Sequence, residues 1–545
     1  LAVVEAPPGP VLAVAGAGSG KTRALTYRVA HLIRRGAAPE RLLLCTFTNR
    51  AAREMVRRVE EIASVDVRQL WAGTFHHVGN RILRRYADRI GLQADYSILD
   101  RGDAADLMGS VLGERPGLGR KQRFPQPNLL LGAMSLASNT LRPLSAVLER
   151  DYPRFAHQTE EIEQVAEAYQ ERKRRLGLLD FDDLLLGWLM ILQEHADLAE
   201  ELQGRFLHVL VDEYQDVNRL QAAITDGMAL GHGSLTVVGD DDQSIYAFRG
   251  AWPDAMLRFT DRHPEATIHR IQSNYRSAPE ILRLANVSIA HNQRRHKKTL
   301  RPVRGPGALP VVASVQDVYQ QAAFVAQRVL ELHEDEGLRL GQMAVLFRAH
   351  AHSLELQVEL TRRQIPFTVR AGMRFFEQAH IKDALAHLRW PTNPRDELAG
   401  MRVLRLQPGI GAAIATRVLA HLSSRDPGQL SEGLTSALTS DGVTGRGRGR
   451  LKALLPHLQT LESTDGPAAA LRAVATGPYR EIAIRKYANA DTRLEDLAQL
   501  ADYAEQYEDT QTFLQEISLM AGMAAEGFQA GEAPDDLLTL STVHQ

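Results

Sequence analysis

The sequence predicts an α/β protein with two parallel sheets, each interrupted by a mostly helical insertion. Three observations indicate this fold class. Short apolar runs alternate with helical patterns in two separate parts of the chain, a glycine-rich loop joins the first such run to a helix, and two long segments contain helical patterns without strands. At about 150 residues per domain, the 545 residues suffice for roughly three to four domains.

The first sheet is predicted from two pairs of apolar runs that are separated by a long helical segment. Residues 11–15 and 42–47 form the first pair, and residues 206–211 and 235–238 form the second. The helical sequence between the pairs has the character of an insertion. We therefore assign residues 1–91 and 196–268 to a first domain and residues 92–195 to its helical insertion.

The second sheet is predicted from later apolar runs, which are again spaced by helical patterns such as residues 318–333. These runs are residues 309–315, 343–347, 367–369 and 537–543. The Gly-Arg alternation at residues 445–450 is the only low-complexity patch, and we interpret it as a loop. We assign residues 269–372 and 536–545 to a second domain and residues 373–535 to its helical insertion.

The composition is that of an ordinary globular protein, with 44% hydrophobic and 24% charged residues, and it excludes a disordered or fibrous chain. Because 64 Lys and Arg nearly balance 66 Asp and Glu, any nucleic-acid surface must be local. The single cysteine, Cys45, excludes a disulfide framework. No apolar run approaches the roughly 20 residues that span a bilayer, so we expect a cytoplasmic protein without a membrane partner.

A phosphate-binding loop follows the first predicted strand. Glycines let successive backbone N–H groups turn toward phosphate oxygens at a helix N-terminus, whose dipole favours negative charge. Lys21 would reach the β and γ phosphates, and Thr22 would hold Mg²⁺. The residues that would contact the nucleotide here are Gly16, Ala17, Gly18, Ser19, Gly20, Lys21 and Thr22.

Two carboxylates follow the predicted strand at residues 206–211. The first, Asp212, can bind Mg²⁺, and the second, Glu213, can take a proton from an attacking water. An Asp-Glu pair after a strand is a weak signal by itself, but together with the glycine loop it predicts nucleotide hydrolysis. We expect ATP and Mg²⁺ to be the ligands of this site.

At this point the sequence resembles the UvrD/PcrA/Rep-type superfamily-1 DNA helicases along nearly all of its length, and bacterial UvrD most closely. Besides the two motifs above, six short segments occur in the order that this family has. They are residues 46–52, 73–76, 238–246, 274–277, 365–367 and 381–383. The resemblance implies two RecA-like P-loop motor domains, each with a mostly helical inserted subdomain.

The resemblance also implies roles for residues around the nucleotide. Gln243 would sense the γ-phosphate, since an amide can donate to phosphate and accept from water. Arg276 would stabilise charge on the transferred phosphoryl group. Arg23 and Tyr275 would stack on either side of the adenine. The catalytic set is therefore Lys21, Asp212, Glu213, Gln243 and Arg276.

For DNA, the resemblance places the aromatic residues Phe47, Tyr246 and Phe248 against bases of a single strand, whose π-faces allow binding without sequence readout. Gly409 and Gly411 in a turn, with Lys382, would hold duplex DNA through its phosphates. A helix–helix turn and core packing of aromatics are the alternatives. The remaining DNA candidates are Asn49, Thr74, His76, Arg249 and His544. The basic runs 172–175 and 294–298 have the charge to contact phosphates, but a charge run is usually a solvated face, and we leave them out of the site.

The predicted function is that of an ATP-dependent DNA helicase that moves 3′ to 5′ on single-stranded DNA and unwinds duplex DNA in DNA repair, associated with the nucleoid. Expected partners are single-stranded DNA, junctions of single and double strands, DNA-repair proteins and further copies of the chain. The alternatives are the motor subunit of a helicase-nuclease and a DNA-binding scaffold switched by nucleotide. The family's adenine-recognising Gln and its second catalytic Arg are not found, so we expect a piece of a longer protein that by itself hydrolyses ATP slowly.

Overall fold

The structure is a computed structural model in which two compact units are distinguished, residues 1–312 and residues 313–545. The structure describes residues 1–64, 66–92, 96–99, 101–115, 124–369, 378–422, 430–439, 446–487, 489–514, 517 and 536–543.

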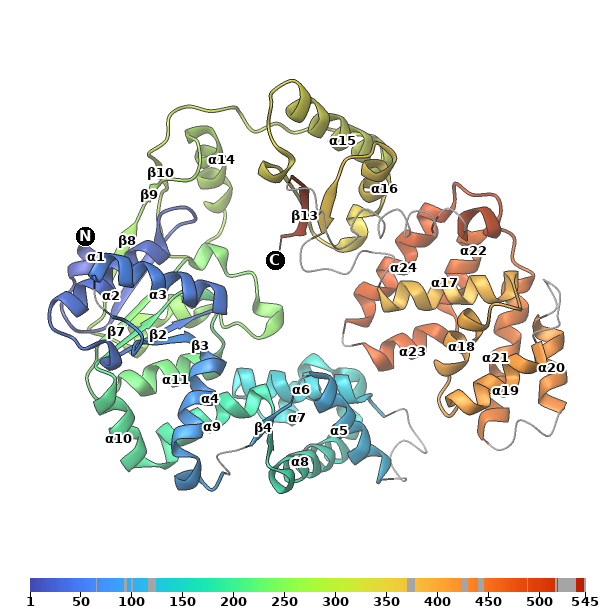
Figure 1. The fold of residues 1–545 in the computed structure, drawn as a ribbon, viewed down its shortest axis with the longest axis horizontal. Coiled ribbons are helices and arrows are strands. Elements are labelled where there is room, and N and C mark those ends of the chain that lie inside the picture. Colours follow the sequence, from blue (N-terminus) through green and yellow to red (C-terminus); the bar gives the residue numbers. More distant parts are fainter. Residues whose placement is uncertain are drawn as a thin grey trace. The chain divides into compact units, whose positions relative to one another are not determined.

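The first unit is built on a six-stranded parallel sheet, with the strand order β3-β2-β6-β7-β1-β8. Figure 1 labels β2, β3, β7 and β8 of this sheet. The strands are β1 (Val11–Ala15), β2 (Leu42–Thr46), β3 (Trp71–Thr74), β6 (His208–Val211), β7 (Leu235–Gly239) and β8 (Thr267–Ile271). The predicted runs at 11–15, 42–47, 206–211 and 235–238 all coincide with strands. Because every pair is parallel, the carboxyl ends of these strands meet at one edge of the sheet, where ligands bind in open α/β sheets.

Both faces of this sheet are buried, which explains why the strands are unbroken hydrophobic runs in the sequence. On one face, Leu12 and Leu43 belong to a core that includes Trp188. On the other face, Ala13 and Leu44 pack with residues of the helix that follows the first strand. The helices next to the strands are α2 (Lys21–Arg34), α3 (Asn49–Ala63), α4 (Phe75–Tyr86) and α11 (Arg219–Ala229).

The segment between the two pairs of strands is helical, as predicted, and it has a core of its own around Met108, Leu130 and Tyr169. A short parallel pair, β4 (Ser97–Ile98) and β5 (Leu178–Leu179), lies within it. Its helices are α5 (Arg101–Gly113), α6 (Pro127–Thr140), α7 (Leu144–Asp151), α8 (Thr159–Leu176) and α9 (Phe181–Glu194), and α10 (Ala196–Arg205) follows it and packs in the core of the sheet.

Residues 269–312, which the sequence analysis assigns to the second domain, pack within the first unit in this structure. Strand β8 pairs with β1, and β9 (Ser273–Asn274) pairs with β10 (Arg301–Pro302) on either side of α14 (Pro279–Ile289). The predicted strand at 309–315 was wrong: these residues form neither helix nor strand, and Val311 and Val312 are exposed. An apolar run becomes a strand only where a neighbouring strand offers its backbone, and this one pairs with none of the described strands.

The second unit contains a three-stranded parallel sheet in the order β11-β13-β12. Its strands are β11 (Ala344–Phe347), β12 (Phe367–Val369) and β13 (Leu538–Thr542), which confirm the predictions at 343–347, 367–369 and 537–543. Helices α15 (Val318–Glu334) and α16 (Leu354–Arg362) pack with the sheet in one core. The helix at 318–333 was therefore predicted correctly.

The other part of the second unit is helical and has its own large core, which includes Trp390 and Tyr479. The loop predicted for the Gly-Arg alternation was wrong over residues 446–450, because they form the first turns of α21. Gly447 is buried there against Ile414, so its missing side chain allows a close approach that outweighs its low helix propensity. The helices are α17 (Ala379–Thr392), α18 (Glu397–Arg405), α19 (Ala412–Leu422), α20 (Leu430–Thr439), α21 (Arg446–Glu462), α22 (Pro467–Thr476), α23 (Pro478–Lys486) and α24 (Ala490–Ala504). Over the described part of the chain, no helix is both long and apolar enough to span a membrane.

Candidate nucleotide and DNA site

The predicted phosphate loop connects the end of β1 to the first turn of α2. Gly18 and Gly20 adopt positive φ values of 69° and 85°, which only glycine adopts without strain. A Cβ atom at Gly18 would lie 2.5 Å from Cβ of Arg276, so this glycine is also required for the close approach of that segment. Ser19 Oγ donates to the carbonyl of Gly16 at 2.7 Å and closes the loop on itself.

The two predicted carboxylates lie beside this loop, because β6 ends at the same edge of the sheet as β1. Lys21 Nζ lies 2.6 Å from Oε2 of Glu213, and Thr22 Oγ1 donates to Oδ2 of Asp212 at 3.1 Å. Glu213 has a φ of 49°, an uncommon value for a non-glycine residue that indicates local strain at a functional position. The structure thus brings together all four residues that the sequence analysis assigned to phosphate, metal and proton transfer here.

Burial makes this edge receptive to a cation. Burial, followed by the charge of Glu213, raises the pKa of Asp212 to about 6. The same two causes raise the pKa of Asp216 to about 6. A divalent cation would relieve the cost of these buried carboxylates, and the hard oxygens of Thr22 and Asp212 are the ligand type that Mg²⁺ prefers. The residues present therefore fit the predicted Mg²⁺ site.

Gln243 lies in the loop after β7 and is held by a neighbour. Its Nε2 donates to Oδ2 of Asp240 at 2.5 Å. Gln215, which the sequence analysis did not select, connects this loop to the catalytic carboxylate: its Nε2 donates to Oε2 of Glu213 at 2.8 Å, and its Oε1 accepts from the backbone N–H of Asp240 at 2.9 Å. The signal that could have indicated this role is its position in the sequence, because Gln215 is an amide between the carboxylates Glu213 and Asp216.

Asn274 is a second residue that sequence reasoning missed, although it opens the segment at 274–277. Its buried side chain donates to the carbonyl of Ala17 at 2.5 Å and accepts from the backbone N–H of Arg276 at 2.9 Å. The backbone N–H of Tyr275 donates to the carbonyl of Gly18 at 3.0 Å. These bonds place Arg276 against the phosphate loop, while Tyr275 stays 60% exposed. Arg23 lies 5.5 Å from the ring centroid of Tyr27 rather than in a described contact with Tyr275.

The three aromatic residues predicted to contact DNA form a continuous row. The rings of Phe47 and Tyr246 are stacked with centroids 6.0 Å apart, and those of Tyr246 and Phe248 lie 6.2 Å apart. Phe47 and Phe248 are 49% and 63% exposed, which is unusual for such large apolar side chains. Phe75, in contrast, is buried against Trp188 and belongs to the core.

The other DNA candidates of the first unit have mixed positions. The ring of His76 lies 5.7 Å from that of Phe181, an exposed residue that the sequence did not indicate. Oγ1 of Thr74 accepts a hydrogen bond from the backbone N–H of His77 and caps α4, so this side chain has a structural partner. Asn49 begins α3 and Arg249 ends a short 3₁₀ turn, but their side chains lie outside the described part of the structure.

In the second unit, Lys382 is exposed on α17, whose neighbouring residues are mostly buried. Gly409 has a φ of 87° in the turn between α18 and α19, and Gly411 has open space where a side chain would stand. Bare backbone in an exposed turn is what the prediction of a phosphate contact requires. His544 lies outside the described residues.

The sheet, the phosphate loop and the carboxylates on adjacent strand ends define a P-loop nucleotide hydrolase with RecA-like architecture. The sequence comparisons specify the family. Residues 1–264 match the UvrD/REP helicase N-terminal domain, and residues 269–430 match the UvrD-like helicase C-terminal domain. The chain belongs to the UvrD/REP helicase family and is a superfamily-1 helicase.

Individual relatives support this assignment. The chain is 32% identical to the ATP-dependent DNA helicase PcrA of Leuconostoc citreum, over 99% of this chain and 73% of that protein. It is 31% identical to the PcrA of a Staphylococcus epidermidis strain, over 98% of this chain and 74% of that protein. It is 35% identical to the PcrA of Bacillus subtilis, over 77% of this chain and 56% of that protein.

Proposed function

We propose that the chain is a DNA-stimulated ATPase that moves 3′ to 5′ along single-stranded DNA and unwinds duplex DNA. The observation that carries this proposal is the adjacency of two sites on one sheet edge. The loop with Gln243 continues directly into Tyr246 and Phe248, so the residue facing the nucleotide and those facing DNA belong to one short segment. A shift at one site therefore has a short covalent path to the other.

The chemistry follows from the residues of the first unit. Lys21 leaves Glu213 when it contacts the γ-phosphate, and the released carboxylate of Glu213 then accepts a proton from the attacking water. Thr22 and Asp212 would hold Mg²⁺, which would supply neutralisation of the phosphate charge when bound. Arg276, held against the phosphate loop through Asn274, stabilises the charge that develops on the phosphoryl group.

DNA binding is assigned to the aromatic row and to the exposed turn of the second unit. Bases stack on Phe47, Tyr246 and Phe248 without regard to sequence, each contact contributing roughly 1 to 3 kcal/mol. Gly409, Gly411 and Lys382 contact duplex phosphates, which implies that junctions of single and double strands are the preferred substrate. Because such a protein works where chromosomal DNA lies, we place it with the nucleoid, in a DNA-repair process that includes protein partners and self-association on DNA.

The test is steady-state ATP hydrolysis with and without an unstructured single-stranded oligonucleotide, with Lys21→Ala as the control. We expect hydrolysis to rise on addition of DNA and to vanish in the variant. Strand displacement from duplexes with either a 3′ or a 5′ tail then reports direction, and only the 3′-tailed duplex is expected to be unwound. Flat hydrolysis by a chain that binds the oligonucleotide would contradict the proposal and would favour a nucleotide-switched scaffold.

The DNA assignment has its own test. Tyr246→Ala removes the central ring of the row, and we expect single-stranded DNA affinity to fall by roughly 5- to 150-fold, since one stacking contact is worth about 1 to 3 kcal/mol. Basal hydrolysis without DNA serves as the internal control and is expected to change little. Unchanged affinity would contradict the placement of DNA on the row.

A further inference from the structure

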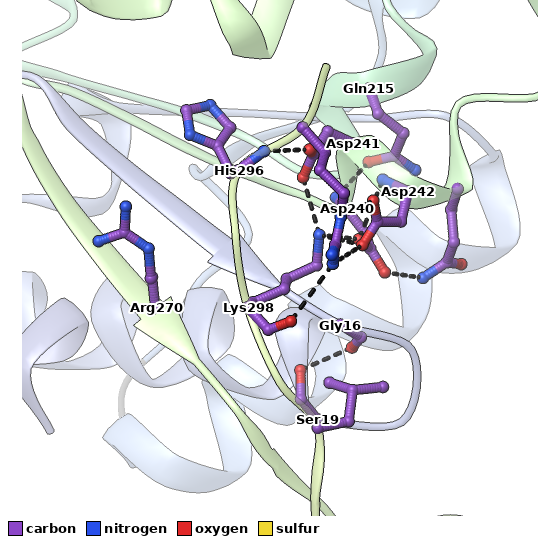
Figure 2. Close-up of polar contacts among 12 residues, drawn as sticks. Gly16, Ser19, Gln215, Asp240, Asp241, Asp242, Arg270, His296 and Lys298 are labelled. Carbon is purple, nitrogen blue, oxygen red and sulfur yellow. Dashed lines mark hydrogen bonds and ion pairs between the residues drawn. The ribbon is translucent and has the colours of Figure 1, made fainter. Parts of the chain in front are cut away.

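A buried lysine lies beside the proposed γ-phosphate sensor, in one of the basic runs that we expected to be solvated. Only 2% of the Lys298 side chain is exposed. Its Nζ lies 2.8 Å from Oδ1 of Asp240, 2.8 Å from Oδ1 of Asp241 and 2.7 Å from Oδ2 of Asp242 (Figure 2). One ammonium group thus holds three consecutive carboxylates, and the prediction of a solvated face was wrong here.

A second cation and a backbone donor complete the cluster. Arg295 donates from Nε to Oδ1 of Asp242 at 2.8 Å and from Nη2 to Oδ2 at 2.7 Å, and its side chain is only 10% exposed. The backbone N–H of His296 donates to Oδ2 of Asp241 at 2.7 Å. Two cations against three carboxylates leave the cluster with a formal charge of −1, and every carboxylate has at least one cationic partner.

The segment 294–300, which we call the strap, also contacts the phosphate loop. A Cβ atom at Gly16 would lie 2.2 Å from Cδ2 of Leu300, so the leucine packs directly on that glycine. The strap continues into β10, which pairs with the strand that precedes Arg276. It therefore contacts two elements of the proposed nucleotide site directly, the phosphate loop and the loop with Gln243, and it leads into the strand that pairs with the segment before Arg276.

Asp240 connects Lys298 to the sensor. One oxygen of its carboxylate, Oδ1, contacts the ammonium of Lys298, and the other, Oδ2, accepts the hydrogen bond from Gln243 Nε2 at 2.5 Å. The orientation of the carboxylate therefore determines where the Gln243 amide points. Without the ammonium, three adjacent buried carboxylates would repel one another, and Asp240 would turn toward solvent and carry the amide with it.

We propose that Lys298 is a positioning residue, which holds the carboxylate of Asp240 so that Gln243 stays aimed at the γ-phosphate of ATP. This inference rests on the proposed function, in which Gln243 contacts that phosphate. The role is specific to the third phosphate. ADP does not reach Gln243, so the lysine contributes to the discrimination between ATP and ADP and to turnover, but not to binding of the diphosphate.

The experiment measures equilibrium binding of fluorescent ADP and of a non-hydrolysable ATP analogue, both with Mg²⁺ and without DNA. In Lys298→Met we expect ADP affinity to stay within twofold, while the ratio of analogue affinity to ADP affinity falls about tenfold. The turnover number of DNA-stimulated hydrolysis is expected to fall at least tenfold. Lys173→Met is the matched control, since that lysine is equally buried between two aspartates away from the nucleotide site, and it should leave the ratio unchanged.

A double-variant comparison separates positioning from a general structural role. If Lys298 acts through Gln243, the variant Lys298→Met/Gln243→Ala should lose no more discrimination than Gln243→Ala alone. If the losses of discrimination in the two single variants instead multiplied in the double variant, the proposal would be overturned. It would also be overturned if Lys298→Met lost ADP affinity and analogue affinity in parallel. Should Lys298→Met fail to fold, Lys298→Met/Asp241→Asn keeps the cluster at −1 and is expected to show the same loss of discrimination.

The variant Gln243→Ala distinguishes a failure of the proposed function from a failure of the positioning role. If Gln243→Ala leaves the discrimination unchanged, the assignment of Gln243 to the γ-phosphate is wrong, and the role of Lys298 is overturned with it. If Gln243→Ala abolishes the discrimination but Lys298→Met preserves it, the proposed function stands and only the positioning role is overturned.

Discussion

Lys173 and Lys298 are buried to nearly the same extent, and each lies within a short basic run of the first unit, but they hold different kinds of structure. Lys173, at the end of α8, donates at 2.5 Å to both Asp180 and Asp183, the capping residues at the start of α9. It joins two helices of the insertion. Lys298 instead joins a strap to a loop that continues into the aromatic row. A buried lysine bound to aspartates thus stabilises helix packing in the insertion, and the same kind of contact holds the loop with Gln243 in the other cluster.

The charge balance of the two clusters also differs. In the insertion, burial and then the neighbouring Asp180 raise the pKa of Asp183 to about 6, even with Lys173 beside it. In the cluster around Lys298, burial also acts to raise the pKa of Asp242, but the hydrogen bonds from Arg295 and Lys298 outweigh it and lower the pKa of that carboxyl. A single cation leaves Asp183 poorly neutralised, whereas two cations together lower the pKa of Asp242.

The largest expected effect is the loss of stability on removing the lysine of the insertion. Lys173→Met leaves Asp180 and Asp183 as adjacent buried carboxylates, and breaking such a pair costs about 3 to 5 kcal/mol. Hydrogen exchange should show faster opening of α8 and α9, and denaturant unfolding should shift accordingly. Lys173→Met/Asp183→Asn, which removes the excess carboxylate, is expected to recover part of the loss. If the free energy of unfolding of Lys173→Met changed by less than about 1 kcal/mol, Lys173 would not have the structural role that we assign to it.

Next in size is the effect of Asp240→Asn on turnover. Lys298 and Gln243 contact different oxygens of Asp240, and asparagine replaces one of these oxygens by an NH2 group, which cannot accept a hydrogen bond. We therefore expect DNA-stimulated hydrolysis to fall about tenfold, equivalent to about 1.4 kcal/mol. Asp180→Asn is the corresponding change in the insertion. Asp180→Asn should leave nucleotide binding in the absence of DNA unaltered. If DNA-stimulated hydrolysis fell equally in both variants, the two clusters would not differ in function.

The pH dependence of stability distinguishes the two clusters, because the pKa of Asp183 is raised and that of Asp242 is lowered. The pKa of Asp183 lies near 6 in the folded chain, above its ordinary value of 3.8, so the folded state binds this proton more tightly than the unfolded state. Stability therefore rises as pH falls from 7 to 5, by on the order of 1 kcal/mol from this group. The measurement is the thermal midpoint of the unchanged chain relative to Asp183→Asn between pH 5 and 7. A constant difference between the two proteins would contradict the prediction.

The sequence predicted the parts of the molecule whose signals are local. The phosphate loop, the carboxylates of Asp212 and Glu213 and the strands that carry them follow from glycine spacing and apolar runs over a few residues. The aromatic row followed from the family resemblance, and the structure places its rings together.

Features that depend on distant partners were not predictable in this way. Lys298 and Asp241 are 57 positions apart, and nothing in a basic run indicates which carboxylates fold onto it. Asn274 and Gln215 stand inside segments that the sequence analysis identified, yet their roles are hydrogen bonds to other segments. Residues 309–315 show the converse error, because an apolar run carries no information on whether a partner strand is present.

The smallest expected effects come from the exposed arginines of the same two runs, and they test whether burial alone separates the lysines from their neighbours. Arg174 lies 3.6 Å from Glu171 with 69% of its side chain exposed, and Arg294 lies 2.6 Å from Asp254 with 77% exposed. Solvent screens such pairs and side-chain entropy opposes them, so Arg174→Met and Arg294→Met should each change stability by less than about 0.5 kcal/mol. Nucleotide discrimination should stay as in the unchanged chain. If Arg294→Met lowered that discrimination as far as Lys298→Met does, the effect would belong to the net charge of the strap, and the contact between Lys298 and Asp240 would no longer be needed to explain it.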